Sequence, residues 1–378
     1  MDGTGTGIAS LIKGEVLRMG ERSVMKAKLF LAALALLVAG TSLAAPDPEP
    51  WRRLAEAGKS AYERGYYPEA EKALKAALAE VERVGDQEPL AVCLNNLGVL
   101  YHATGRNDEA AAMIQRSLEL RRRINGAEHP LVATGLNNLA EVYRGERQYE
   151  QAEPLYLKAI EIWRKTLGPG DAQTASGMMN LAELYRAKRR FKEARAFYRG
   201  ALAIFEKNLE PRDLRLATCL NNLGTSFSDD NKPDKARPYY LRALEAAEKA
   251  GAPEHPTAAT ALLNLGLDYQ SQRKYLEADG PLRRSLAFRE KGLGPEHPAL
   301  VSLLDTLGDG CRKLGNFADA ERFYRRSLEI QEKSLPARDP SVTASLERLL
   351  AVLHQSGNYR EAARVEARIE ALRSGYAR

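Results

Sequence analysis

The feature that most constrains this chain is a spacing of 42 residues that recurs without interruption across six successive intervals. A leucine, a tyrosine-type residue and an alanine each follow it, and an earlier copy precedes them at a spacing of 40. A period of this length is typical of helix-pair repeats that stack into a solenoid. The three series are Leu97, Leu139, Leu181, Leu223, Leu265, Leu307 and Leu349; Tyr101, Tyr143, Tyr185, Phe227, Tyr269, Cys311 and Leu353; and Ala110, Ala152, Ala194, Ala236, Ala278, Ala320 and Ala362.

Each period contains two amphipathic helices. In residues 131–145, Leu136, Leu139 and Tyr143 fall at i, i+3 and i+7 on one helical face. Gly135 is a small residue beside that face and lets a neighbouring helix approach closely. After a short polar turn, a second apolar stripe follows at Ala152, Tyr156, Ile160 and Trp163. The sequence therefore predicts an all-α fold of about eight helix-turn-helix repeats over residues 51–373, with a linker at 45–50 and a tail at 374–378.

The boundaries between periods carry helix-start signals. Proline follows at several of them, where the first helical turn tolerates its missing N–H. Asp339, which precedes a proline, is a good N-cap, and Asp171 and Asp213 occupy the same place. The same place is taken by His129, His255 and His297. A residue that exchanges with aspartate in this way is predicted to cap a helix and not to act as a catalyst.

Residues 1–44 read as a pre-sequence with a signal peptide. Lys26 and Lys28 begin it, an apolar run of about eleven residues follows, and Ser42-Leu43-Ala44 gives a small-x-small cleavage site. The run is shorter than the roughly 20 residues of a membrane-spanning helix, although an uncleaved anchor is the alternative. We expect cleavage after Ala44, no stable membrane anchor afterwards, and a periplasmic or secreted protein. Translation starting at Met19 or Met25 would explain the residues that precede the signal.

The charge balance gives little support for nucleic acid as a partner. The net charge is +6, and about +4 remains beyond residue 44, spread along the chain. We found no run of basic residues interleaved with aromatic residues. Nucleic acid is therefore not an expected partner.

The sequence Leu97-Gly98-Val99-Leu100-Tyr101, followed by Ala110, resembles a tetratricopeptide repeat (TPR), and the resemblance covers nearly the whole chain after residue 50. The 42-residue period, the string at 136–143 and Leu293-Gly294-Pro295-Glu296-His297-Pro298 are similar to the kinesin light chain subtype. This resemblance implies a right-handed α-solenoid whose inner groove binds extended peptide segments of partner proteins. The export signal and the lack of coiled-coil heptads depart from a motor subunit.

A ladder of asparagines runs along the first helices of the repeats. In the resembling families, an Asn at this place reaches the ligand backbone from the concave side, and an amide both donates and accepts. The alternative is that these amides bond to the backbone of an adjacent repeat and fix curvature. The ladder ends where Thr306 and Arg348 replace Asn. Its members are Asn96, Asn138, Asn180, Asn222 and Asn264, while the neighbouring Asn95, Asn137 and Asn221 are expected to be structural.

Hydroxyl and charged side chains complete the predicted groove. The hydroxyl row lies four residues before the ladder, and its alternative role is to bond back to its own helix. The charged residues would set specificity, since arginine can hold a ligand carboxylate in a bidentate manner. Their alternative role is a bridge from each arginine to a glutamate on the next helix. The hydroxyl row is Thr134, Ser176, Thr218, Thr260 and Ser302, and the charged residues are Glu141, Glu183, Arg144 and Arg186.

Nothing in the sequence points to catalysis, a cofactor or a metal. Phosphate loops, nucleophile elbows and HExxH motifs are not found in the sequence. Cys93, Cys219 and Cys311 read as buried small residues, because repeats separate them too widely for a disulfide. We expect a non-enzymatic scaffold that binds an unidentified protein or peptide in its groove. The alternative is a structural adaptor or oligomer assembly factor that uses its convex or end surfaces.

Overall fold

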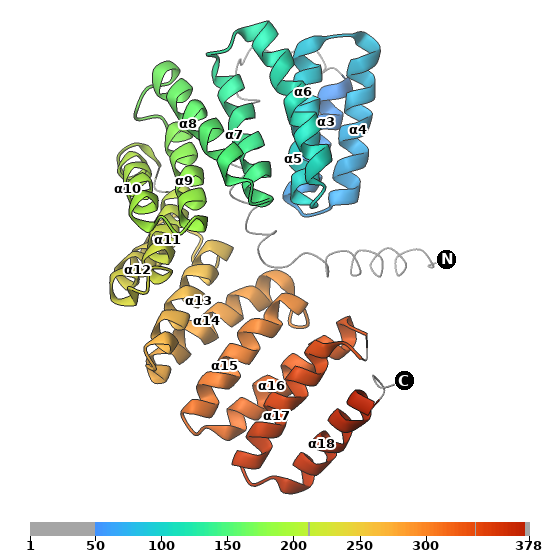
Figure 1. The fold of residues 1–378 in the computed structure, drawn as a ribbon, viewed down its shortest axis with the longest axis vertical. Coiled ribbons are helices and arrows are strands. Elements are labelled where there is room, and N and C mark those ends of the chain that lie inside the picture. The colour runs from blue at the N-terminus through green and yellow to red at the C-terminus, as the bar shows by residue number, and fades with distance from the viewer. Residues whose placement is uncertain (1–49, 211, 337, 375–378) are drawn as a thin grey trace. The chain divides into compact units, whose positions relative to one another are not determined.

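The computed structural model describes residues 50–210, 212–336 and 338–374. These residues form sixteen α-helices and one short 3-10 helix, with no strand among them. The helices follow one another as eight pairs (Figure 1). Each helix packs most extensively against the other member of its pair, except α17, which packs more extensively against α16 of the preceding pair. The expected all-helical fold of about eight repeats is confirmed. The predicted signal at 25–45 lies outside the described residues.

The helix pairs belong to two compact units, divided between residues 209 and 210. The first unit contains α3 (Pro50–Glu63), α4 (Tyr67–Val84), α5 (Gln87–Ala103), α6 (Asn107–Asn125), α7 (Pro130–Gly145), α8 (Tyr149–Thr166), α9 (Ala172–Ala187) and α10 (Phe191–Asn208). The second contains α11 (Arg215–Ser228), α12 (Pro233–Lys249), α13 (Pro256–Ser271), α14 (Tyr275–Leu293), η1 (Pro298–Leu300), α15 (Val301–Lys313), α16 (Phe317–Ser334), α17 (Pro340–Gln355) and α18 (Tyr359–Ser374). Each unit therefore holds four complete pairs.

Small residues allow the helices to pack closely. All seven alanines of the 42-residue series are at most 1% exposed. A Cβ placed on Gly135 of α7 would lie 2.6 Å from Leu118 Cδ2 of α6, closer than real contacts permit. A side chain at residue 135 would therefore require Leu118 to move or α7 to shift away from α6.

The turn inside each pair uses a left-handed residue. Its φ is positive at Gly105 and Gly315, and equally at Arg147 and Asn231, at the same place in the period. In the α7–α8 turn, the N–H of Gln148 donates to the Tyr143 carbonyl at 2.8 Å, which ends α7 and redirects the chain. The local geometry is thus retained even where the period does not supply glycine.

Side-chain caps begin the first helix of many pairs. Nδ1 of His129 accepts from the N–H of Leu131 at 3.2 Å, and His297 accepts from Ala299 at 3.1 Å. Asp171 accepts from Gln173 at 2.7 Å in the same way. The prediction that histidine and aspartate are interchangeable caps at this position is confirmed. Each cap satisfies an N–H that the first helical turn would otherwise leave unpaired.

Candidate functional site

The predicted groove residues lie along the first helices of successive pairs, and we call this set the stripe. In the first unit α5 contacts α7 and α7 contacts α9, so the stripe residues of neighbouring repeats face the same side. In the second unit α11 contacts α13 in the same manner. The stripe comprises Asn96, Thr134, Asn138, Glu141, Arg144, Ser176, Asn180, Glu183 and Arg186 in the first unit, and Thr218, Asn222, Thr260 and Asn264 in the second.

The hydroxyl row bonds back to its own helices. Thr134 donates to the Pro130 carbonyl at 3.2 Å, and Ser176 donates to the Ala172 carbonyl at 2.9 Å. Thr218 and Thr260 donate to carbonyls four residues earlier at 3.1 and 2.9 Å. This is the alternative role named for them from the sequence. Their O–H groups already donate to these carbonyls, so toward a ligand these hydroxyls can act only as hydrogen-bond acceptors.

The asparagine ladder links repeats through side chains. Asn138 Nδ2 donates to Asn95 Oδ1 at 2.9 Å, across 43 residues. The same link recurs at 3.0 Å from Asn180 to Asn137 and at 3.1 Å from Asn264 to Asn221. These three amides therefore bond to an adjacent repeat, as in the alternative to ligand binding that the sequence offered. Their partner is an asparagine side chain, however, and not the backbone.

The ladder asparagines differ in exposure. Asn138 is only 1% exposed, whereas Asn96, Asn180, Asn222 and Asn264 are half-buried. In the second unit, Arg348 takes the ladder position and bonds Asp305 Oδ2 at 2.8 Å, again across 43 residues. The link between repeats thus persists after the amide has been replaced by an ion pair.

The charged stripe residues pair within their own helices. Arg144 Nη2 lies 2.7 Å from Glu141 Oε2, and Arg186 Nη2 lies 2.7 Å from Glu183 Oε2. The bridge therefore goes to the glutamate three residues earlier, and not to the next helix as the sequence alternative stated. Side-chain exposure falls from 29% at Arg186 to 7% at Glu141.

Tyrosines from the second helices hold the carboxylates from the core side. The hydroxyl of Tyr156 donates to Glu141, and that of Tyr198 donates to Glu183. In the second unit, Tyr324 donates to Asp309 at 2.7 Å. Glu141 and Glu183 are therefore each held by an arginine and by a tyrosine hydroxyl, whereas Asp309 is half exposed and lies 3.9 Å from Arg312.

Charge alternates from α7 to α9. Burial alone would raise the pKa of Glu183, but the charges of Arg186 and Arg144 and the Tyr198 hydroxyl bring it below its usual range. Burial likewise opposes ionisation of Glu141, and Arg144 together with Tyr156 lowers the pKa of this carboxyl overall. Because Arg144 acts on both carboxylates, the four charges form one row across two repeats.

The sequence analysis missed these tyrosine partners, although a signal was present. The carboxylates at 141, 183 and 309 each have a tyrosine fifteen residues later. Val99 and Leu267 occupy the same position in two other repeats, and there the residues fifteen later are Ile114 and Leu282. In these repeats the two positions change together because they face each other within one helix pair, whereas the last repeat departs from the pattern with Ala351 and Glu366.

On α11 and α13 of the second unit the stripe is neutral. Thr225 and Leu267 stand where the first unit has its glutamates, and Leu267 is 41% exposed. Thr225 accepts a second hydrogen bond from Asn264 Nδ2, at 3.2 Å. This part of the stripe offers amides, hydroxyls and one apolar side chain.

The described residues contain no cluster of histidine, cysteine and acidic side chains suited to a metal ion. None of the helices in the described ranges is both long and apolar enough to span a membrane. Cys93, Cys219 and Cys311 are buried, and none of these three cysteines forms a disulfide.

Stacked helix pairs joined by side-chain links, with a polar stripe on the first helices, define a helical repeat scaffold. The profile of the tetratricopeptide repeat family matches residues 54–123, 102–165, 131–207, 173–249, 216–291 and 257–333. The chain therefore belongs to the tetratricopeptide repeat family. Domains of this family generally bind protein partners and are generally non-catalytic.

Several solved structures are similar to this chain. BtubC (BKLC) from P. vanneervenii is 25% identical, with a TM-score of 0.47, over 61% of this chain and 92% of that one. Kinesin light chain TPR-like repeats from Podosopora anserina are 21% identical, with a TM-score of 0.47, over 55% of this chain and 98% of that one. A Pyrococcus horikoshii STAND protein with a tetratricopeptide repeat sensor is 16% identical, with a TM-score of 0.66, over 91% of this chain and 49% of that one. No match was found among curated proteins.

Proposed function

We propose that the protein is a non-catalytic interaction scaffold whose stripe binds an extended segment of a partner protein. The observation that carries this proposal is the row of alternating charges Glu141, Arg144, Glu183 and Arg186 on adjacent first helices. Each charge is already fixed by a neighbouring side chain. A binding surface of this kind loses little side-chain entropy when a partner docks.

The contacts divide the stripe into two roles. Asn138 and the hydroxyls are engaged in holding helices and repeats together. Asn96, Asn180 and Arg186 are half-buried, so part of each side chain is exposed where a ligand could contact it, although Asn180 also bonds Asn137 and Arg186 also pairs with Glu183. An amide row with flanking charges can grip an extended backbone and select among the side chains that it carries.

The test is a cross-linked affinity capture from cell-envelope extract, comparing the native protein with Arg186→Gln. The control is Arg83→Gln, because Arg83 forms the same i, i+3 pair with Glu80 on α4, away from the stripe. Thermal melts establish beforehand that all three proteins are folded. We expect one partner to be captured by the native protein and the control, and to be depleted with Arg186→Gln.

Equal capture by all three proteins would contradict binding through the stripe. The partner would then contact another surface, as in the alternative of a structural adaptor or assembly factor. Cross-linked peptides identified by mass spectrometry would locate that surface directly.

We further propose that the protein is exported to the periplasm or secreted. The support is the basic start, apolar run and small-x-small site within residues 25–45. Mass spectrometry of the N-terminal peptide from cell fractions tests this proposal. A mature chain beginning at Ala45 outside the cytoplasm is expected, and an intact Met19 or Met25 terminus in the cytoplasm would refute it.

A further inference from the structure

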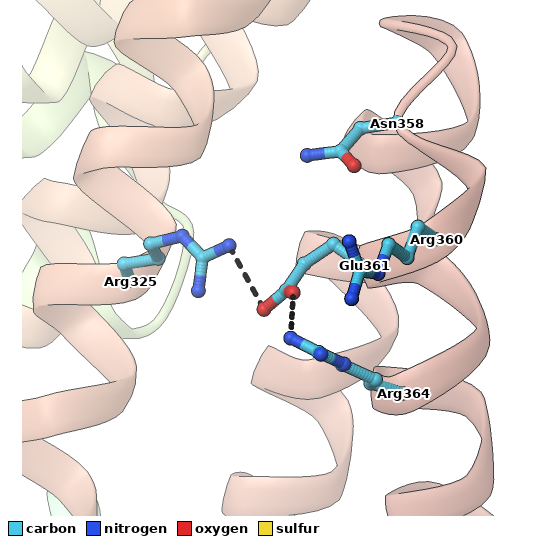
Figure 2. A pocket seen from close by; sticks show the side chains of 5 residues that line it. All are labelled: Arg325, Asn358, Arg360, Glu361 and Arg364. Atoms are coloured by element: carbon cyan, nitrogen blue, oxygen red, sulfur yellow. Dashed lines mark hydrogen bonds and ion pairs between the residues drawn. The ribbon is translucent and has the colours of Figure 1, made fainter.

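A cavity of about 430 Å³ lies between α16 and α18, the second helices of the last two pairs (Figure 2). It is lined by Arg325 from α16 and by Asn358, Arg360, Glu361 and Arg364 at the start of α18. It is widely open to solvent, so an organic group can reach the side chains that line it. Three guanidinium groups and an amide face one carboxylate there.

The preceding repeat provides an internal comparison. It has equivalent residues on α14 and α16, and there the charged groups and the amide are paired with one another. Arg283 of α14 bonds Asp279 at 2.7 Å and Asp319 of α16 at 2.8 Å. Arg322 lies 3.1 Å from Asp319, and the Asn316 side chain accepts from the Asp319 N–H at 3.3 Å. Two arginines are thus matched by two carboxylates, and the amide is occupied.

The arrangement at the cavity is looser. Arg325 is held by Glu321 at 2.8 Å, but its distance to Glu361 is 3.4 Å. Arg364 lies 3.3 Å from Glu361, as Figure 2 shows. These ion pairs are longer than their counterparts at Asp319, so Glu361 holds the two arginines less closely.

The cavity also has an unmatched charge. Arg360 stands where the preceding repeat has Ala318, and it has no hydrogen bond or ion pair within the described residues. The Asn358 side chain likewise has no hydrogen bond within these ranges, unlike Asn316. The three arginines of the lining, together with Glu321 and Glu361, leave one positive charge in excess.

We propose that this cavity, which we call the α16–α18 cleft, binds the carboxylates of an acidic segment of a partner protein. A guanidinium group can donate two parallel hydrogen bonds to the two oxygens of a carboxylate and carries the opposite charge. The Asn358 amide can donate a further hydrogen bond. Tyr359 is 68% exposed between Asn358 and Arg360, and tyrosine with arginine is typical of protein interfaces. The cleft lies on second helices, so this surface is separate from the stripe.

The test is a fluorescence-anisotropy titration of the full chain with a labelled hexaglutamate peptide, and with hexalysine as the charge control. Arg364→Ala is compared with Arg322→Ala, because these equivalent arginines are 66% and 65% exposed. We expect saturable hexaglutamate binding, weakened about fivefold by Arg364→Ala or Arg360→Ala and unchanged by Arg322→Ala. Glu361→Gln should tighten binding, because it removes the competing carboxylate.

Three results would overturn the proposal. They are no saturable binding of hexaglutamate, equal weakening by Arg364→Ala and Arg322→Ala, or displacement of the peptide by an equal concentration of inorganic phosphate. The second result would indicate general attraction to a basic surface, and the third would indicate a site for a free oxyanion. Arg83→Gln on α4, which belongs to neither the stripe nor the cleft, should leave hexaglutamate affinity unchanged.

Discussion

Asp268 of α13 is a carboxylate where most other repeats have an apolar core residue. The equivalent residues include Val142, Leu184 and Val352, each completely buried. Asp268 is itself 4% exposed, and its Oδ2 has no hydrogen-bond partner. A buried, incompletely bonded carboxylate favours its protonated form.

The groups around Asp268 only partly compensate for burial. Burial raises the pKa of Asp268 to about 6, while the Ser228 hydroxyl and the charge of Arg237 act to lower it. The nearby acidic residues Asp229 and Asp234 raise it further. The Tyr240 hydroxyl lies against the same cluster, bonded to Ser228 and Thr225.

This environment predicts that Asp268 makes folding depend on pH. The folded pKa of about 6 lies above the ordinary 3.8, so the contribution to stability is complete below 3.8 and is lost as pH rises through 6. The full change corresponds to about 3 kcal/mol of the free energy of unfolding. Urea unfolding followed by circular dichroism should show this loss in the native protein and not in Asp268→Asn. Parallel pH profiles of the two proteins would contradict it.

For individual residues, the sequence predicted which positions are buried or cap a helix better than it predicted which side chains bond to each other. The buried alanines and the caps at His129 and Asp171 could be predicted because each depends on local helical spacing. The bond from Tyr156 to Glu141 could not, since it depends on which faces two helices turn toward each other. The same reason explains why the side-chain partners of the asparagine ladder were not foreseen.

At the scale of the helix, the starting cap of the α15 pair provides a second pH effect, of opposite sign. His297 accepts from the Ala299 N–H through Nδ1, which requires a neutral ring. Burial lowers the pKa of His297 below the ordinary 6.5, so the neutral form is favoured in the folded chain. The cap therefore stabilises the helix above 6.5 and is lost as pH falls below it.

We expect His297→Asp to remove this loss on mild acidification. Aspartate caps the equivalent helix at Asp171. The ordinary pKa of an aspartate side chain, about 3.9, lies well below that of histidine. Between neutral pH and about pH 5, the variant should retain about 1 kcal/mol of unfolding free energy that the native protein loses. The measurement is the difference between the two urea midpoints at each pH, in which the opposing contribution of Asp268 cancels. A midpoint difference that does not change with pH would count against the cap.

Helix pairing explains why the elements were predictable and the charged row was not. The 42-residue period reports which faces are apolar, and therefore which helices form. Arg144 pairs with Glu141, three residues earlier on the same helix. A carboxylate on the next helix would have been an alternative partner for the same arginine. Spacing alone did not decide between these partners.

At the scale of the whole chain, the repeat period and the compact units carry different information. The 42-residue spacing continues unchanged past residue 209, although the chain divides into two units between residues 209 and 210. A constant spacing shows that the repeats are alike, but it does not show which repeats pack together into one compact unit. Each unit has its own buried core, with Leu100, Leu136 and Ile162 in the first and Leu304, Leu307 and Leu349 in the second.

Because repeat proteins are stabilised by contacts within pairs and between nearest neighbours, each unit should fold alone. We expect fragments 50–209 and 210–378 each to be helical and to unfold cooperatively on heating. Their summed far-ultraviolet spectra should reproduce that of residues 50–378. Fragment 50–187 is the matched control: it ends after α9 and removes α10, against which α9 packs most extensively. It should unfold at a lower temperature than 50–209, because the apolar face of α9 would be exposed to water. If 50–209 showed no cooperative transition, or melted no higher than 50–187, the first unit would depend on the second for its stability.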